Sequence, residues 1–315
     1  EPRGAQPRNA SARHGARALA VWVTARAGIA VSACPSAARL VAAGEASRGG
    51  AWCRAAQPAH ASQSVAMLFK TAFNGYSVKF SPYHEGRLAV ATAQNFGIIG
   101  NGKQHVLDIT PQGLVEVASF DTLDGLYDCA WCEENENVLA SASGDGSIKV
   151  WDIAAPPHVN PIRSYEEHGH EVYSLAWNLV HRNCFLSASW DDTIKLWNLE
   201  ANVSQRTFAE HSYCCYDVAW SPTNGESFAS ASGDCTVKLW DTRQPGSSLT
   251  IRAHDFEVLT VDWNKYNDFS IVTGSVDKTI RVWDIRAPKQ PLRTLLGHTY
   301  AVRRVVCSPH SESVV

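Results

Sequence analysis

The chain has 315 residues, 45% of them hydrophobic and 19% charged, a composition that excludes a protein disordered throughout. No uninterrupted stretch approaches the roughly 20 apolar residues that a membrane-spanning helix needs, so direct membrane insertion is not expected. The formal net charge of -3, from 28 basic and 31 acidic residues, gives no overall attraction to nucleic acid. We therefore expect a globular protein without a nucleic-acid partner.

The first 66 residues differ in composition from the rest. They carry eight Arg, no Lys and two acids, a charge of +6, which leaves about -9 on residues 67–315 from 20 basic and 29 acidic residues. An Arg-rich, acid-poor leader with many Ala and Ser residues is typical of an organelle transit peptide. The alternative is that translation begins at Met67, the one methionine, and that the preceding residues are upstream sequence, disordered if made. The expected domains are this leader, 1–66, and a folded domain, 67–315.

Two expected strands open the folded part: 76–82, whose apolar residues alternate with polar ones, and the largely apolar run 88–93. The glycine-rich run 97–102 follows the second strand and is expected to be a hairpin loop.

Tryptophans at regular intervals organise the remainder of the chain. Four of them end alternating strands, in steps of 46, 43 and 43 residues, at Trp131, Trp177, Trp220 and Trp263. An Asp stands 14 residues after each, and a second Trp six residues further on: Asp145 and Trp151, Asp191 and Trp197, Asp234 and Trp240, Asp277 and Trp283. The residues between Asp and the second Trp alternate, and turn residues separate the segments at hairpin distances. Each unit is therefore predicted to be a small antiparallel sheet.

A His lies nine residues before the first Trp position in most units, at His168, His211, His254 and His298. Thr122 takes this place in the unit of Trp131, and the earliest unit has Gln94 in place of the Asp and no Trp-Asp pair. A sixth unit begins at 297–298 and runs to 309, shortly before Val315.

The coincident His, Asp and Trp-Asp positions resemble the WD-repeat family. The resemblance implies an all-β fold, a WD40 β-propeller with four strands per blade, of which this chain holds about five complete blades and the start of a sixth. Such propellers usually close with seven blades of about 40 to 45 residues, so the chain is expected to be incomplete at its C-terminus. The first and fifth blades would then expose apolar faces and unpaired edges, which favours aggregation.

The resemblance also implies that the repeated His, Ser or Thr, Asp and Trp form a hydrogen-bond chain that locks each blade. An active site is needed once, whereas these groups recur, so no enzyme activity is expected. Cys129 and Cys132 form a lone C-x-x-C whose sulfurs point to opposite faces of a strand, and neither a metal nor another cofactor is expected. The expected tetrad residues are His168, Asp191, Trp197, His211, Ser232, Asp234, Trp240, His254, Asp277 and Trp283.

Other residues indicate a binding face. Tyrosine recurs four residues before the first Trp position, and acids stand nearby, a composition that suits a cationic amphipathic peptide. The alternative is that the tyrosines are packing residues and the acids a solvated rim. The candidate peptide-binding residues are Asp124, Tyr127, Asp128, Glu171, Tyr173, Trp190 and Glu257.

Segments away from the repeat consensus, 73–82, 87–97, 124–128 and 297–305, are similar to the peroxin-7 family in a plant-like form, over about residues 68 to 315. The similarity implies a cytoplasmic import receptor that cycles to the peroxisome matrix. It would bind an N-terminal signal of the pattern Arg-Leu, five variable residues, His-Leu on cargo proteins, together with a peroxin co-receptor and a docking complex.

On this hypothesis the acidic candidates oppose the cationic groups of the signal, and the aromatic candidates cover its apolar stripe. The alternative is a WD-repeat adaptor of a ubiquitin ligase or chromatin complex that uses the same face.

Overall fold

The structure is a computed structural model that describes Leu19–Thr24, Gly28–Ala33 and residues 67–315. Its elements are strands, apart from two single helical turns in this part of the chain, η1 (Gln94–Gly97) and η2 (Pro157–Val159). Among the same residues, no helix is long and apolar enough to cross a membrane.

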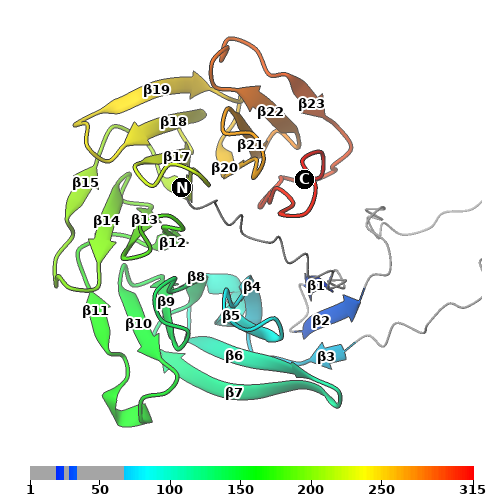
Figure 1. The fold of residues 1–315 in the computed structure, drawn as a ribbon, viewed down its shortest axis with the longest axis vertical. Coiled ribbons are helices and arrows are strands. Elements are labelled where there is room, and N and C mark those ends of the chain that lie inside the picture. Colours follow the sequence, from blue (N-terminus) through cyan, green and yellow to red (C-terminus); the bar gives the residue numbers. More distant parts are fainter. Residues whose placement is uncertain (1–18, 25–27, 34–66) are drawn as a thin grey trace, which may run out of the picture.

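Five four-stranded antiparallel sheets follow one another around a central axis (Figure 1). Each contains consecutive strands, with the first nearest the axis, so the expected all-β propeller of about five blades is confirmed. The first blade contains β4 (Asn74–Phe80), β5 (Arg87–Ala93), β6 (Gly102–Thr110) and β7 (Gly113–Thr122), and the second contains β8 (Leu126–Trp131), β9 (Val138–Ser143), β10 (Ile148–Asp152) and β11 (Arg163–Tyr165). The third contains β12 (Val172–Trp177), β13 (Cys184–Ser189), β14 (Ile194–Asn198) and β15 (Arg206–Phe208), and the fourth contains β16 (Cys215–Trp220), β17 (Ser227–Ser232), β18 (Thr236–Asp241) and β19 (Ser247–Arg252). The fifth contains β20 (Val258–Trp263), β21 (Ser270–Ser275), β22 (Ile280–Asp284) and β23 (Arg293–Leu295).

A further sheet joins β1 (Leu19–Thr24), β2 (Gly28–Ala33) and β3 (Met67–Phe69). Phe69 packs against the apolar cluster of the first blade. Strands β1 and β2 belong to the segment expected to be a leader. The rest of that segment lies outside the described residues, so the leader stays a prediction.

Three of the four regular tryptophans at the ends of inner strands donate a hydrogen bond to the preceding blade. The indole nitrogen of Trp220 donates to the carbonyl of Ala176 on the preceding inner strand at 3.0 Å, and Trp263 repeats this contact with Ala219. Trp131 likewise donates to Lys79. A large ring with one hydrogen-bond donor thus fills the wedge between two sheets and satisfies a carbonyl there, which explains why this residue recurs.

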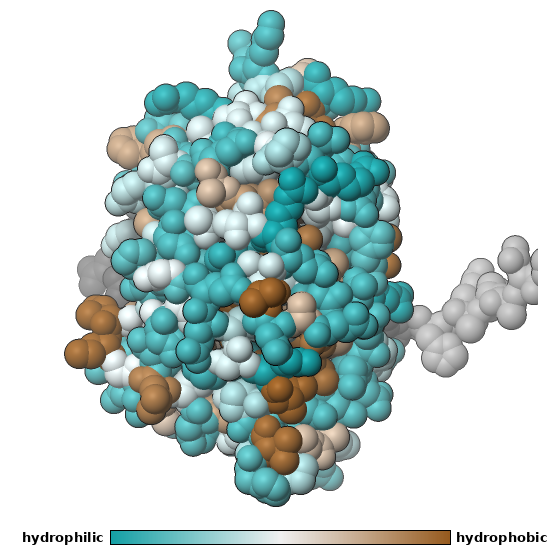
Figure 2. Space-filling view, turned by 90° about the vertical axis from the view of Figure 1, so that its left-hand side faces the viewer, coloured by the Kyte–Doolittle hydropathy of each residue, from teal (hydrophilic) through white to brown (hydrophobic). Residues whose placement is uncertain are grey.

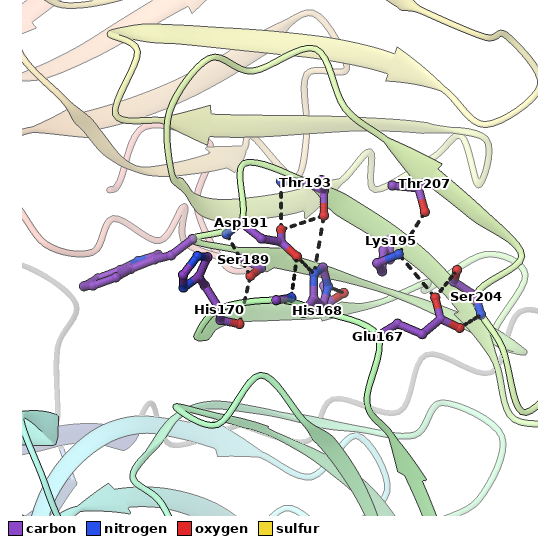
Figure 3. Close-up of polar contacts among 12 residues, drawn as sticks. Glu167, His168, His170, Ser189, Asp191, Thr193, Lys195, Ser204 and Thr207 are labelled. Carbon is purple, nitrogen blue, oxygen red and sulfur yellow. Dashed lines mark hydrogen bonds and ion pairs between the residues drawn. The ribbon is translucent and has the colours of Figure 1, made fainter.

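A hydrogen-bond chain locks the blade of β12 to β15. Trp197 Nε1 donates to Ser187 Oγ (2.8 Å), which lies 2.7 Å from His168 Nε2, and His168 Nδ1 lies 2.7 Å from Asp191 Oδ2. Figure 3 shows His168 facing Asp191, with Thr193 beside the carboxylate. The next two blades join the same groups, through His211, Ser230, Asp234 and Trp240 and through His254, Thr273, Asp277 and Trp283.

Ser232 is not a member of this chain, and its expected role is wrong. Ser230 bonds both His211 and Trp240. Ser232 lies two residues nearer the loop, where its hydroxyl donates to the carbonyl of Tyr213 and accepts from the amide of Asp234. Both serines point to the same side of β17, and only their position along the strand decides which one the indole reaches.

The segment after β23 lies beside β20 without forming a strand. The amide of Val305 donates to Thr260 Oγ1 at 3.2 Å, and the amide of Cys307 donates to Asp262 Oδ2 at 2.8 Å. Val302 and Val305 pack against Val272 of β21. The sixth unit thus begins as expected, but side-chain acceptors replace strand partners among the described residues.

The outer edge is mainly hydrophilic, with isolated hydrophobic residues, when seen from the side of β11 and β15 (Figure 2). Three of the five outermost strands have only three residues. On the blade of β15, Lys195 binds Glu167 and Thr207 (Figure 3). Short, charged edges discourage pairing with another chain, which leaves the axial ends as the more favourable places for recognition.

Candidate functional site

Four tyrosines form a ring at the end of the propeller where the inner strands begin. Tyr76, Tyr127, Tyr173 and Tyr216 come from β4, β8, β12 and β16, and we call them the tyrosine ring. Successive ring centroids lie 5.1, 5.1 and 5.7 Å apart. These are favourable aromatic contacts, worth about 0.5–1.5 kcal/mol each.

A β-bulge places each of these tyrosines. The pairing of every inner strand with its neighbour skips one residue, and in four of the five blades the skipped residue is the tyrosine. A bulge bends the strand and changes the direction of the extra side chain. The repeated tyrosine could be found in the sequence, whereas the bulge that turns it toward the axis could not.

Trp190 extends the aromatic surface from the turn after β13. Its ring stacks on Tyr173, with centroids 5.5 Å apart, and meets Tyr216 edge-on at 6.0 Å. Its indole nitrogen is buried without a hydrogen-bond partner among the described residues. Three aromatic candidates, Tyr127, Tyr173 and Trp190, are therefore brought together in one cluster, in which Tyr173 and Trp190 are half-exposed and Tyr127 is buried.

Three acids border the ring. Asp124, Glu171 and Glu257 are half-buried, and none of them forms a salt bridge within the described part of the chain. Burial, aided by the neighbouring Tyr76, Glu171 and Asp124, raises the pKa of Tyr127 to about 12. The pKa of Tyr216 is likewise about 12, because of burial and several neighbours that include Glu257. The unneutralised carboxylates give this face negative potential.

Asp128 does not belong to this face, and its expected contact with a ligand is wrong. Its side chain is fully buried, 3.0 Å from Arg304 and 3.8 Å from Lys79, and it accepts a hydrogen bond from Ser77 at 2.6 Å. Burial opposes ionisation, but Lys79 and Arg304 hold the pKa of Asp128 below its ordinary value. The bulge at Tyr127 directs the tyrosine to the open end and leaves Asp128 in the layer beneath.

Arg304 joins two carboxylates across the axis beneath the tyrosine ring. Its guanidinium lies 3.0 Å from Asp128 and 2.7 Å from Asp217, and Asp217 also accepts from Ser174 and Thr260 at 2.7 Å each. Burial disfavours the charge, but the two aspartates raise the pKa of Arg304. This central ion network could not be found in the sequence, because its members come from separate blades.

Arg303, which directly precedes Arg304 in the chain, contacts the tyrosine ring. Its guanidinium carbon lies 5.9 Å from the centroid of Tyr173, and it donates a hydrogen bond to the Tyr173 hydroxyl. In the sequence Arg303 takes the tyrosine position of the sixth unit, yet it is not among the candidate residues.

The turn η1 forms an apolar border beside Tyr76 and Tyr127, whose hydroxyls donate to the carbonyls of Phe96 and Gly97. Gly97 has φ of 73°, and a Cβ there would lie 2.6 Å from the Tyr127 ring, so only glycine fits. Ile98 and Ile99 are 85% and 72% exposed. The face therefore offers aromatic, acidic and aliphatic contacts together.

The other end of the axis is different. A cavity of about 310 Å³ opens there, lined by tryptophans of the inner strands and by charged residues of both signs: Lys79, Lys265, Arg304, Glu133, Asp217 and Asp262. Among the described residues, no group of three or more His, Cys, Asp or Glu is arranged to hold a metal ion. Burial raises the pKa of the Cys129 thiol to about 12, so this sulfur is poorly suited to ligate a metal as a thiolate.

Comparisons with known proteins identify both the repeats and similar chains. The model of the family "WD domain, G-beta repeat" matches residues 117–152, 159–198, 202–241 and 246–284. The chain is 59% identical over 107 residues to "Peroxisome biogenesis protein 7" of Arabidopsis thaliana, a match that covers 33% of this chain and 34% of the relative.

Two other relatives are named "Peroxisomal targeting signal 2 receptor". The protein of Dictyostelium discoideum is 59% identical over 105 residues, 33% of each chain. The Homo sapiens protein is 49% identical over 107 residues, 34% of this chain and 32% of the relative. The matches thus span about a third of the length of these curated relatives.

Proposed function

We propose that this chain, in which four segments match the model of the WD repeat, is a receptor for the second class of peroxisomal targeting signal on cargo proteins. The names of its relatives support this proposal. The observation that carries it in the structure is the tyrosine ring bordered by three carboxylates that form no salt bridge with the described residues. Such a face suits binding rather than catalysis.

The pattern Arg-Leu, five variable residues, His-Leu fits this face as a helix. Its Arg and His are seven residues apart, about 10 Å along a helix, and lie on one side, because 3.6 residues make one turn. Asp124 and Glu171 lie near Tyr127, and Glu257 near Tyr216, so the acids flank the ring at two places. We assign these acids to the cationic groups of the signal.

The aromatic side chains would cover the leucines of the signal. Tyr173 and Trp190 present flat, half-exposed rings, which bury apolar area at low cost in conformational entropy, and the buried Tyr127 packs against Tyr173. The proposal includes a peroxin co-receptor and a docking complex that complete delivery from the cytoplasm to the peroxisome matrix. The exposed Ile98 and Ile99 offer additional apolar area beside the ring.

A peptide titration with the 315-residue chain tests the proposal. Charge reversal by Glu171→Lys together with Glu257→Lys should raise the Kd of a nonapeptide of this pattern at least tenfold, about 1.4 kcal/mol, because two attractive charges become repulsive. Glu134→Lys is the matched control, since Glu134 is an exposed acid in the loop between β8 and β9, at the far end of the blade.

Unchanged binding by the double variant would reject the assigned roles. A nonapeptide with Ala in place of its Arg should bind more weakly than the original. If the two bound equally, the face would not be reading this signal, and the WD-repeat adaptor hypothesis would be favoured instead.

A further inference from the structure

Arg303 stands out because the other charged groups bordering the tyrosine ring are acidic. Its guanidinium contacts the aromatic ring and the hydroxyl of Tyr173. It forms no salt bridge with any residue of the described chain. A cation above an aromatic face gains about 0.5–1 kcal/mol at an exposed site. Arg303 thus adds one positive charge to an acidic face without being neutralised.

The backbone around Arg303 is fixed. Val302 and Val305 are 6% and 5% exposed, and their amides donate to Ser275 and Thr260. Arg304 is bound to the central ion network. The guanidinium of Arg303 can change rotamer, but its backbone is held beside β20 and β21 by these neighbours.

Charges therefore alternate along three of the four tyrosines of the ring. Tyr173 lies between Tyr127 and Tyr216, at centroid distances of 5.1 and 5.7 Å. Acids influence Tyr127 and Tyr216, whereas Arg303 contacts Tyr173 between them. A helix lying across these three rings would meet negative, positive and negative potential in turn.

From this alternation we infer that Arg303 is a specificity residue, which favours an acidic side chain and rejects a basic one at the middle of the bound signal. The inference rests on the proposed function. In a helix, positions 1, 4 and 8 share one side. With the Arg at position 1 and the His at position 8 over the acids, the variable residue at position 4 faces Arg303.

Three nonapeptides that differ only at position 4, with Glu, Gln or Lys, test this in titrations at low salt. The Kd of the Lys peptide should exceed that of the Glu peptide at least tenfold, with Gln between them. Arg303→Gln should reduce this ratio to below threefold, and Arg303→Glu should invert it. Added salt should also reduce the ratio, because the charges are partly exposed.

Two further variants separate specificity from folding. Arg303→Lys keeps the charge and should keep the order of the three peptides. Arg243→Gln is the matched control, because Arg243 is an exposed arginine paired with Asp241 at the opposite end of its sheet. If Arg303 had only a structural role, Arg303→Gln would weaken all three peptides by the same factor.

The outcomes distinguish this inference from the proposed function. Binding of all three peptides without a preference at position 4, or a preference that survives Arg303→Gln, overturns the inference and leaves the receptor function standing. If no peptide binds the chain, the receptor function is rejected, and the inference with it.

Discussion

At the scale of single residues, the hydrogen-bond chain satisfies both ring nitrogens of its histidine. His211 Nδ1 lies 2.7 Å from Asp234 Oδ2 and His211 Nε2 lies 2.7 Å from Ser230 Oγ, and Ser230 in turn accepts from Trp240. The arrangement resembles a hydrolase triad in composition, but its serine oxygen is occupied by an indole and buried.

Removing the hydroxyl at the centre of this chain should be costly. Ser230→Ala leaves a buried indole donor and a buried imidazole nitrogen without partners, so we expect a loss of about 1–3 kcal/mol in the free energy of unfolding. Chemical denaturation followed by tryptophan fluorescence measures it. Ser164→Ala, at an exposed serine of β11, is the control and should change stability by less than about 0.5 kcal/mol. Equal effects of the two variants would contradict the prediction.

At the scale of strands, the sequence predicts the strands and hairpins that repeat in each unit. It does not reveal the contacts that form only when the blades assemble. The spacing from Trp220 to Trp240 predicts three strands and their hairpins, because period-two alternation and turn residues act locally. Arg304 and Asp217, in contrast, are 87 residues apart and meet only because inner strands converge on one axis. The placement of Asp128 failed for a related reason, since a bulge changes which side chain of the strand faces the open end.

The central ion network should therefore connect the stabilities of several inner strands. Arg304→Gln leaves Asp217 without its cation and Asp128 with Lys79 alone, and we expect a loss of about 1–3 kcal/mol. This is less than for a fully buried pair, because the Arg304 side chain is 38% exposed. The double variant with Asp128→Asn should lose less than the sum of the two single variants, as measured by urea denaturation. Additive losses would show that the two residues do not interact.

At the scale of the whole molecule, each blade depends on its neighbour to cover an apolar face. Trp263 and Val261 of β20 pack against the preceding blade. The face of the fifth blade that points away from the fourth blade contacts the segment of Val302, Val305 and Cys307 instead of a complete sheet. This segment also carries Arg303 and Arg304, so the packing that covers the fifth blade also positions charges at the candidate site.

Adjacent valines of this segment provide the sharpest test of that connection. Val305 is 5% exposed and Val306 is 61% exposed. Val305→Asp places a carboxylate in the apolar cluster, so we expect a loss of several kcal/mol, about 2–5, increased binding of a hydrophobic dye and weaker binding of the nonapeptide. Val306→Asp adds the same charge one residue away and should leave thermal unfolding and dye binding nearly unchanged. If Val305→Asp destabilised the chain but left peptide affinity intact, the covering of the fifth blade and the candidate site would be independent.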